Sequence, residues 1–139
     1  MRLAPAPLGA ARTEDILTAL VPSGTGWITF FQRGRQIPAM GVDASGQPDY
    51  RWRQVLEEAE PYSFNAARTD RGLLALWRRD TALLVAPLGP DGLPSQPGRM
   101  LVPYGYDARL TCGPSRCLVI YNQGSQSTSG RSSHCMKFA

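Results

Sequence analysis

The most constraining feature of the sequence is a weak internal repeat with a period near 45 residues. The apolar segment at 26–31 returns 46 residues later at 72–77, and an equivalent segment follows 44 residues after that at 116–121. Turns fall in step as well, as in the Gly/Asp/Pro-containing segments 43–48 and 89–94. A period of this length is typical of arrays of small β units that bury their apolar faces only against one another.

The repeat depends on residue class more than on residue identity. A shift of 46 residues over 16–60 gives five identities, whereas ordinary residue frequencies give roughly three. The identical pairs are Gly26/Gly72, Arg33/Arg79, Gly46/Gly92, Pro48/Pro94 and Arg53/Arg99. Apolar runs and turn residues nevertheless stay in step over a whole unit without a gap, so the pattern carries the prediction.

Each unit is predicted to form four short strands. Aromatic and β-branched residues between Gly, Pro and Asp turns favour strands. In the first unit the strands are expected at 16–20, 26–31, 36–42 and 51–56, in the second at 62–67, 72–77, 82–88 and 99–102, and in a third at 107–112 and 116–121. The segment 51–60 also has helix propensity, but its counterpart contains Gly98 and Pro103, so strand is preferred there.

Two runs in the second unit carry a family resemblance. The sequences GLLALW at 72–77 and ALLVAPLGPDG at 82–92 resemble the blades of bacterial β-propeller repeat proteins, in which an apolar strand precedes a strand ending in an Asp-Gly turn. The resemblance extends over about residues 16–121 and implies an all-β fold, a partial β-propeller built of four-stranded antiparallel blades. A β-sandwich is the alternative, because six to eight short strands also form two packed sheets. Propeller blades occur in proteins with many roles, so the resemblance implies little about activity.

The same pattern divides the chain into five parts. We expect an N-terminal extension or the end of a preceding blade at 1–15, a first blade at 16–60, a second at 61–105, half of a third at 106–121, and a disordered polar tail at 122–139. Propellers close with about four to eight blades. The expectation is therefore a fragment of a larger protein, whose open strand edges favour self-association.

Charge and hydropathy narrow the classes of partner. The net charge is +4, and fourteen of the fifteen basic residues are arginine, as in many proteins rich in Ala, Gly and Pro. A basic charge usually suggests a nucleic-acid partner. Because of this arginine bias, the charge is only weak evidence for such a partner here. No apolar run approaches the roughly 20 residues of a membrane span, and no apolar signal-peptide core follows Met1. A protein or carbohydrate ligand is the expected partner.

The cysteines allow one disulfide. Cys112 and Cys117 flank a Gly-Pro turn, and in an antiparallel hairpin such residues face each other within disulfide range. Two buried free thiols are the equally open alternative. A disulfide would imply an oxidising compartment, and so an extracytoplasmic location for the full-length parent. Cys135 and His134 alone do not make a metal site.

No catalytic, metal or cofactor site is predicted from the sequence. The only histidine is His134, in the expected tail, which argues against a Ser/His or Cys/His nucleophilic site. The acidic run at 57–60 has no second carboxylate cluster to pair with for acid/base chemistry. The scattered aspartates have no EF-hand spacing. The chain is therefore expected not to be an enzyme by itself.

One face is predicted to carry binding residues. In a four-stranded antiparallel blade, the turn between strands two and three lies at the same end as the connection to the next blade. This rim would carry Arg33, Arg35, Arg78, Arg79, Tyr104 and Tyr106, together with the acidic residues Glu57, Glu58, Glu60 and Asp107. Loops on a rigid scaffold concentrate binding residues, and Arg and Tyr are favoured at interfaces. Ordinary solvated turns with weak ion pairs are the alternative.

Two function classes follow from these observations. The first is a non-catalytic binding or scaffold module that presents the rim to a ligand. The second is part of a propeller enzyme, such as a hydrolase or lyase, whose catalytic residues lie outside this chain. The absence of clustered acids and of a histidine outside the tail favours the first.

Overall fold

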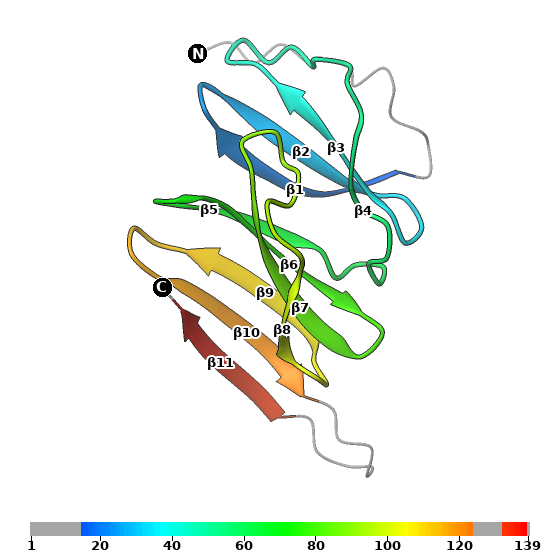
Figure 1. Cartoon of the computed structure of the whole chain (residues 1–139), viewed down its shortest axis with the longest axis vertical. Helices are drawn as coiled ribbons and strands as arrows, with labels where there is room; N and C mark the ends of the chain where they lie inside the picture. The colour runs from blue at the N-terminus through cyan, green and yellow to red at the C-terminus, as the bar shows by residue number, and fades with distance from the viewer. Residues whose placement is uncertain (1–14, 124–131, 139) are drawn as a thin grey trace.

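The computed structural model describes residues 15–123 and 132–138, and within them the chain forms strands and no helix. Three antiparallel sheets follow one another along the long axis of the molecule in the order of the sequence (Figure 1). None of the three closes on itself in this part of the chain. The all-β prediction is confirmed, with three sheets in place of the two of a sandwich.

The first two sheets have four strands each, in sequence order. The first contains β1 (Ile16–Ser23), β2 (Gly26–Gln32), β3 (Ile37–Val42) and β4 (Arg53–Leu56), and the second contains β5 (Asn65–Thr69), β6 (Gly72–Arg79), β7 (Ala82–Leu88) and β8 (Arg99–Val102). The third sheet has the order β11-β10-β9 and contains β9 (Tyr106–Cys112), β10 (Cys117–Gln123) and β11 (Ser132–Phe138).

The first and second sheets have the same strand pairing at a shift of 46 residues. Ile37 pairs with Leu56 in the first sheet, and Leu83 pairs with Val102 in the second. In both sheets a register shift follows immediately, between Ile37 and Pro38 in the first and between the equivalent Leu83 and Leu84 in the second. The apolar and turn positions that fall in step in the sequence therefore occupy equivalent places in the two sheets.

The long turns after β3 and β7 are also equivalent. Val42 forms a bridge with Pro48, and Leu88 forms one with Pro94. A glycine near the middle of each turn has a positive φ, 87° at Gly46 and 85° at Gly92. Glycine adopts this conformation without steric cost, which explains why both positions carry it.

The second sheet is buried on both faces. Leu73, Ala75 and Trp77 of β6 pack in the core shared with the first sheet, where Phe30 contacts Phe64 with ring centroids 5.1 Å apart. Leu74 and Leu76 of the same strand pack toward the third sheet. Successive residues of a strand point to opposite faces, so burial on both sides explains the unbroken apolar run at 72–77.

The C-terminal segment differs from its expected disorder. β11 pairs with β10 from Cys117↔Phe138 to Gln123↔Ser132. The prediction of a disordered tail at 122–139 is therefore wrong for residues 122–123, which end β10, and for residues 132–138. The edge of β10 supplies backbone partners to β11, and the polar composition of this segment does not indicate them. Residues 124–131 and 139, like the expected extension at 1–14, lie outside the described residues.

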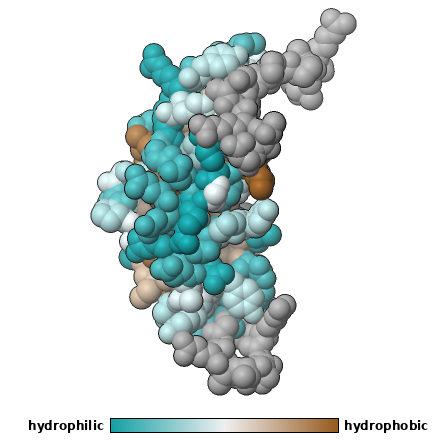
Figure 2. Space-filling model, turned by 90° about the vertical axis from the view of Figure 1, so that its right-hand side faces the viewer, coloured by the Kyte–Doolittle hydropathy of each residue, from teal (hydrophilic) through white to brown (hydrophobic). Residues whose placement is uncertain are grey.

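The surface in this structure is predominantly hydrophilic on the face drawn in Figure 2, where hydrophobic residues form separate spots. Within the described ranges, no helix has the length and hydropathy needed to cross a bilayer.

Candidate functional site

The rim predicted from topology carries a cavity of about 270 Å³ between the second and third sheets. We call it the rim cavity. The connection after β4 and parts of β6, β7 and β9 line it, through Glu60, Pro61, Tyr62, Ser63, Arg78, Leu83, Tyr106, Asp107 and Ala108. Two predicted site residues, Arg78 and Tyr106, are among these, as are Glu60 and Asp107 of the predicted acidic set.

Backbone hydrogen bonds hold the rim together. The Ala59 N–H donates to the carbonyl oxygen of Arg35 at 2.7 Å, and the Gly105 N–H donates to that of Thr81 at 2.9 Å. The two bonds are equivalent at the 46-residue shift and attach each sheet-to-sheet connection to the turn between the second and third strands. The connection after β4, which lines the cavity, and its equivalent after β8 are therefore both fixed to the scaffold.

The turn at 60–63 is tied to the end of β6. The Glu60 N–H donates to the Arg78 carbonyl oxygen at 2.8 Å. Ser63 Oγ accepts from the Arg78 N–H at 3.1 Å and donates to the Glu60 carbonyl oxygen at 2.6 Å. This bonding holds Tyr62, which lies between Glu60 and Ser63, at one wall of the cavity.

A second contact joins the cavity walls across the two sheets. The side-chain amide of Asn65 donates to the Ala108 carbonyl oxygen at 3.1 Å and to that of Ser63 at 3.2 Å. Because Ala108 belongs to β9, this amide fixes the distance between the wall from the second sheet and the wall from the third.

Two residues of the cavity have a left-handed backbone. Tyr62 has φ 62° and Asp107 has φ 50°. Such values are uncommon for residues other than glycine and cost roughly 1–3 kcal/mol when the surrounding structure imposes them. Unfavourable conformations of this kind are often found at binding sites, and here two of them face one cavity.

The cavity presents both hydrogen-bond donors and acceptors. Arg78 Nε is buried and has no hydrogen-bond partner among the described residues. The Glu60 carboxylate forms an ion pair with Arg35 at 3.0 Å, while Asp107 is exposed and receives a long hydrogen bond of 3.5 Å from Asn122. Leaving a buried donor unsatisfied costs about 1–3 kcal/mol, so the Arg78 guanidinium is a hydrogen-bond donor whose capacity the protein does not use in full.

Arg33 does not line the rim cavity, and its side chain has a structural role instead. Its Nε and one terminal nitrogen bind the two carboxylate oxygens of Asp15 at 2.8 Å each, and the Asp15 side chain is only 1% exposed. The guanidinium carbon also lies 5.2 Å from the ring centroid of Trp52. This pair joins the start of the first sheet to the turn after β2.

The other predicted rim residues lie outside the rim cavity. Arg35 is exposed and forms ion pairs with Glu60 at 3.0 Å and with Asp80 at 3.8 Å. Arg79 is exposed at the end of β6, and Tyr104 is exposed before β9. None of these three side chains lines the cavity, although Arg35 contacts the lining residue Glu60.

Tyr62 and Ser63 are residues of the cavity that were expected in a strand but lie in the connection before β5. The prediction begins a strand at Tyr62, whereas β5 begins at Asn65. Pro61 indicates this connection in the sequence, because a proline disfavours continued regular structure and often marks a turn. The exposed fraction of Tyr62 is 76%, as fits a residue in a connection.

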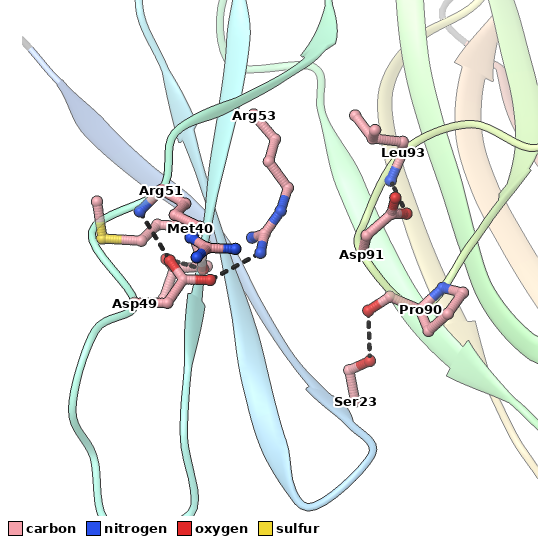
Figure 3. A network of polar contacts seen from close by, with 9 residues as sticks. Ser23, Met40, Asp49, Arg51, Arg53, Pro90, Asp91 and Leu93 are labelled. Carbon is pink, nitrogen blue, oxygen red and sulfur yellow. Dashed lines mark hydrogen bonds and ion pairs between the residues drawn. The ribbon is translucent and has the colours of Figure 1, made fainter.

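The opposite rim contains polar contacts that brace the loops (Figure 3). Asp49 accepts hydrogen bonds from the Arg53 guanidinium at 2.7 Å and from the Arg51 N–H at 2.9 Å. Burial acts to raise the pKa of Asp49, but the bonds from Arg51 and Arg53 outweigh it and hold the pKa below 3.8. Ser23 Oγ donates to the Pro90 carbonyl oxygen at 3.0 Å and so joins the first sheet to the second.

The β9–β10 hairpin is closed by a disulfide at this same opposite rim. Cys112 and Cys117 are directly paired in the two strands, and their sulfurs are 2.10 Å apart. The structure thus has the bonded form of the two alternatives. No group of three His, Cys, Asp or Glu residues that could hold a metal ion occurs in the described part of the chain.

Comparison with known proteins adds no family. No protein-family model matches the chain, and no match is found among curated proteins or solved structures.

Proposed function

We propose that the three sheets are consecutive blades of a β-propeller and that the protein is a non-catalytic binding module. The equal strand pairing of the first two sheets, their four antiparallel strands in sequence order and their face-to-face stacking support this architecture. The blade-like motifs at 72–92 support it independently.

The ligand proposed for the rim cavity is a small neutral saccharide. The observation that carries this proposal is that Arg78, whose Nε has no hydrogen-bond partner among the described residues, lines a cavity together with Tyr62, Tyr106 and two carboxylates. Saccharide hydroxyls both donate and accept, so one ring can accept from Arg78 and donate to Glu60 or Asp107. A volume near 270 Å³ lies at the small end of ligand sites.

A binding role fits the rim cavity better than a catalytic one. Glu60 is already engaged with Arg35, and none of the residues lining the cavity is a histidine or cysteine. A general acid/base pair needs two groups free to exchange protons with the substrate. We therefore assign Glu60 and Asp107 the role of hydrogen-bond acceptors.

The proposal is tested by saturation-transfer NMR with glucose, galactose, mannose, N-acetylglucosamine and their disaccharides, followed by titration calorimetry. The Arg78→Gln variant keeps the backbone bond to Ser63 but loses the guanidinium. Loss of one charged hydrogen bond, about 1.5–3 kcal/mol, weakens binding about tenfold or more.

Arg79→Gln is the matched control, since Arg79 is adjacent, exposed and outside the cavity. Its affinity should equal that of the wild type. If no sugar of the panel binds saturably, or if Arg78→Gln binds as well as the wild type, the saccharide site is wrong.

A further inference from the structure

A second and larger cavity, of about 420 Å³, lies between the second and third sheets at the opposite rim. We call it the arginine cavity. The β5–β6 turn, the segment before β8 and the β9–β10 turn contribute to its walls. Its volume falls within the range of about 300–1,000 Å³ that is usual for small-molecule sites.

Three arginines from three separate segments line this cavity. Arg71 follows β5, Arg99 begins β8, and Arg116 precedes β10; all three are exposed. None of their guanidinium groups forms a hydrogen bond or ion pair with another described residue. Asp70 is the single carboxylate in the described lining. Three like charges at one opening repel one another and favour an anion there.

The wall of the cavity formed by the second sheet is apolar. Leu74, Val85 and Pro87 lie on the face of that sheet that packs toward the third, and Leu73 and Ala86, whose side chains pack toward the first sheet, also border the cavity. An inorganic anion would leave this wall in contact with water. Burial of an alkyl chain on it is favourable, at about 25 cal/mol per Å².

The disulfide fixes the backbone that carries Arg116. Cys117 itself lines the cavity next to Arg116, and the Gly113 N–H donates to the Arg116 carbonyl oxygen at 2.8 Å within the closed hairpin. A site whose backbone is already ordered loses less conformational entropy when it binds a ligand.

We propose that the arginine cavity binds a small amphipathic carboxylate. The carboxylate contacts Arg99 and Arg116, and the alkyl part lies against Leu74 and Val85, which share the face of the second sheet that packs toward the third. Guanidinium groups suit this head group because they form paired, charge-assisted hydrogen bonds with both carboxylate oxygens. This site is separate from the rim cavity and does not depend on a saccharide ligand.

The test is a calorimetric titration of the whole protein with octanoate, below its micellar concentration, and in parallel with 1-octanol and inorganic phosphate. Octanoate is expected to bind saturably and more tightly than either of the others, since only octanoate carries both the charge and the chain. The double variant Arg99→Gln/Arg116→Gln is expected to bind octanoate at least about tenfold more weakly.

Arg79→Gln serves as the control, because it removes one exposed positive charge at the other rim. It should bind octanoate like the wild type, and circular dichroism of each variant checks that the fold is retained. Equal binding of octanoate and 1-octanol, equal binding of octanoate and phosphate, unchanged affinity in the double variant, or no saturable octanoate binding would each overturn the proposal.

Discussion

The first and second sheets share their strand pairing but differ in their surroundings. Trp27 and Leu73 occupy equivalent places, opposite Val42 and Leu88, yet Trp27 is 38% exposed and Leu73 only 5%. The second sheet has neighbours on both faces, whereas the first exposes part of one face. The backbone template is therefore the same in both sheets, and burial depends on the neighbouring sheet.

The largest difference is expected between Arg33 and its equivalent, Arg79. Arg33→Ala leaves the buried Asp15 carboxylate without its bidentate partner, which should cost about 4 kcal/mol. Arg79→Ala removes an exposed side chain and should change the free energy of unfolding by less than about 0.5 kcal/mol. Urea denaturation of both variants measures the difference, and equal effects would show that the two turns have the same role.

The next difference concerns the two equivalent apolar positions. Leu73→Ala creates a cavity in the core between the sheets and should lower the free energy of unfolding by about 3 kcal/mol. Trp27→Ala should cost clearly less, because its ring is partly in water already. Thermal and urea unfolding check both values. A larger loss for Trp27→Ala would mean that the outer face of the first sheet is covered in solution.

A smaller and pH-dependent difference is expected at Asp49, whose equivalent in the second sheet is the uncharged Ser95. Since the pKa of Asp49 is lowered in the folded protein, its contribution to stability is present at neutral pH and disappears as the pH falls below about 3.8.

Asp49→Asn should therefore be less stable than the wild type at pH 7, by at most about 1 kcal/mol because the ion pair is partly exposed. The two proteins should converge in stability once the pH has fallen below the lowered pKa of Asp49. Asp43, whose pKa is also lowered, chiefly by the Ser45 hydroxyl, keeps some acid sensitivity in the variant. A stability gap that stays constant from pH 7 to pH 2 would contradict the assignment.

The smallest effect on stability is expected at the exposed face of the first sheet. Leu17 and Leu20 of β1 are 56% and 57% exposed, so Leu20→Ser should change unfolding by less than about 0.5 kcal/mol. If the chain self-associates through this face, the variant should have a lower average mass by light scattering. The same mass for variant and wild type would exclude Leu20 from the contact.

The sequence predicted the parts of the fold that local pattern determines. The strands from β1 to β10 and the turns between them follow from apolar runs and from residues such as Gly46 and Gly92. β11 escaped prediction because its partner, the edge of β10, determines it more than its own Ser-rich composition does.

The candidate site was predictable only in part. Topology placed Arg78 and Tyr106 on the rim where the rim cavity lies, because the turn positions follow from the strand order. The role of Arg33 could not be predicted, since its partner Asp15 is 18 residues away and nothing local indicates their pairing. The arginine cavity could not be predicted for the same reason, because Arg71, Arg99 and Arg116 come together only when the sheets pack.

The equal strand pairing of the first two sheets also fixes a unit of chain length. Each paired residue from β2 to β4 has an equivalent 46 residues later, between β6 and β8. The two residues have the same place in their sheets and the same side-chain direction. A deletion or duplication of 46 residues between equivalent points keeps every apolar side chain on its own face. A change of 45 or 47 residues within a strand would turn the following side chains to the opposite face. The fold should therefore tolerate the insertion or deletion of a whole 46-residue unit better than that of a single residue within a strand.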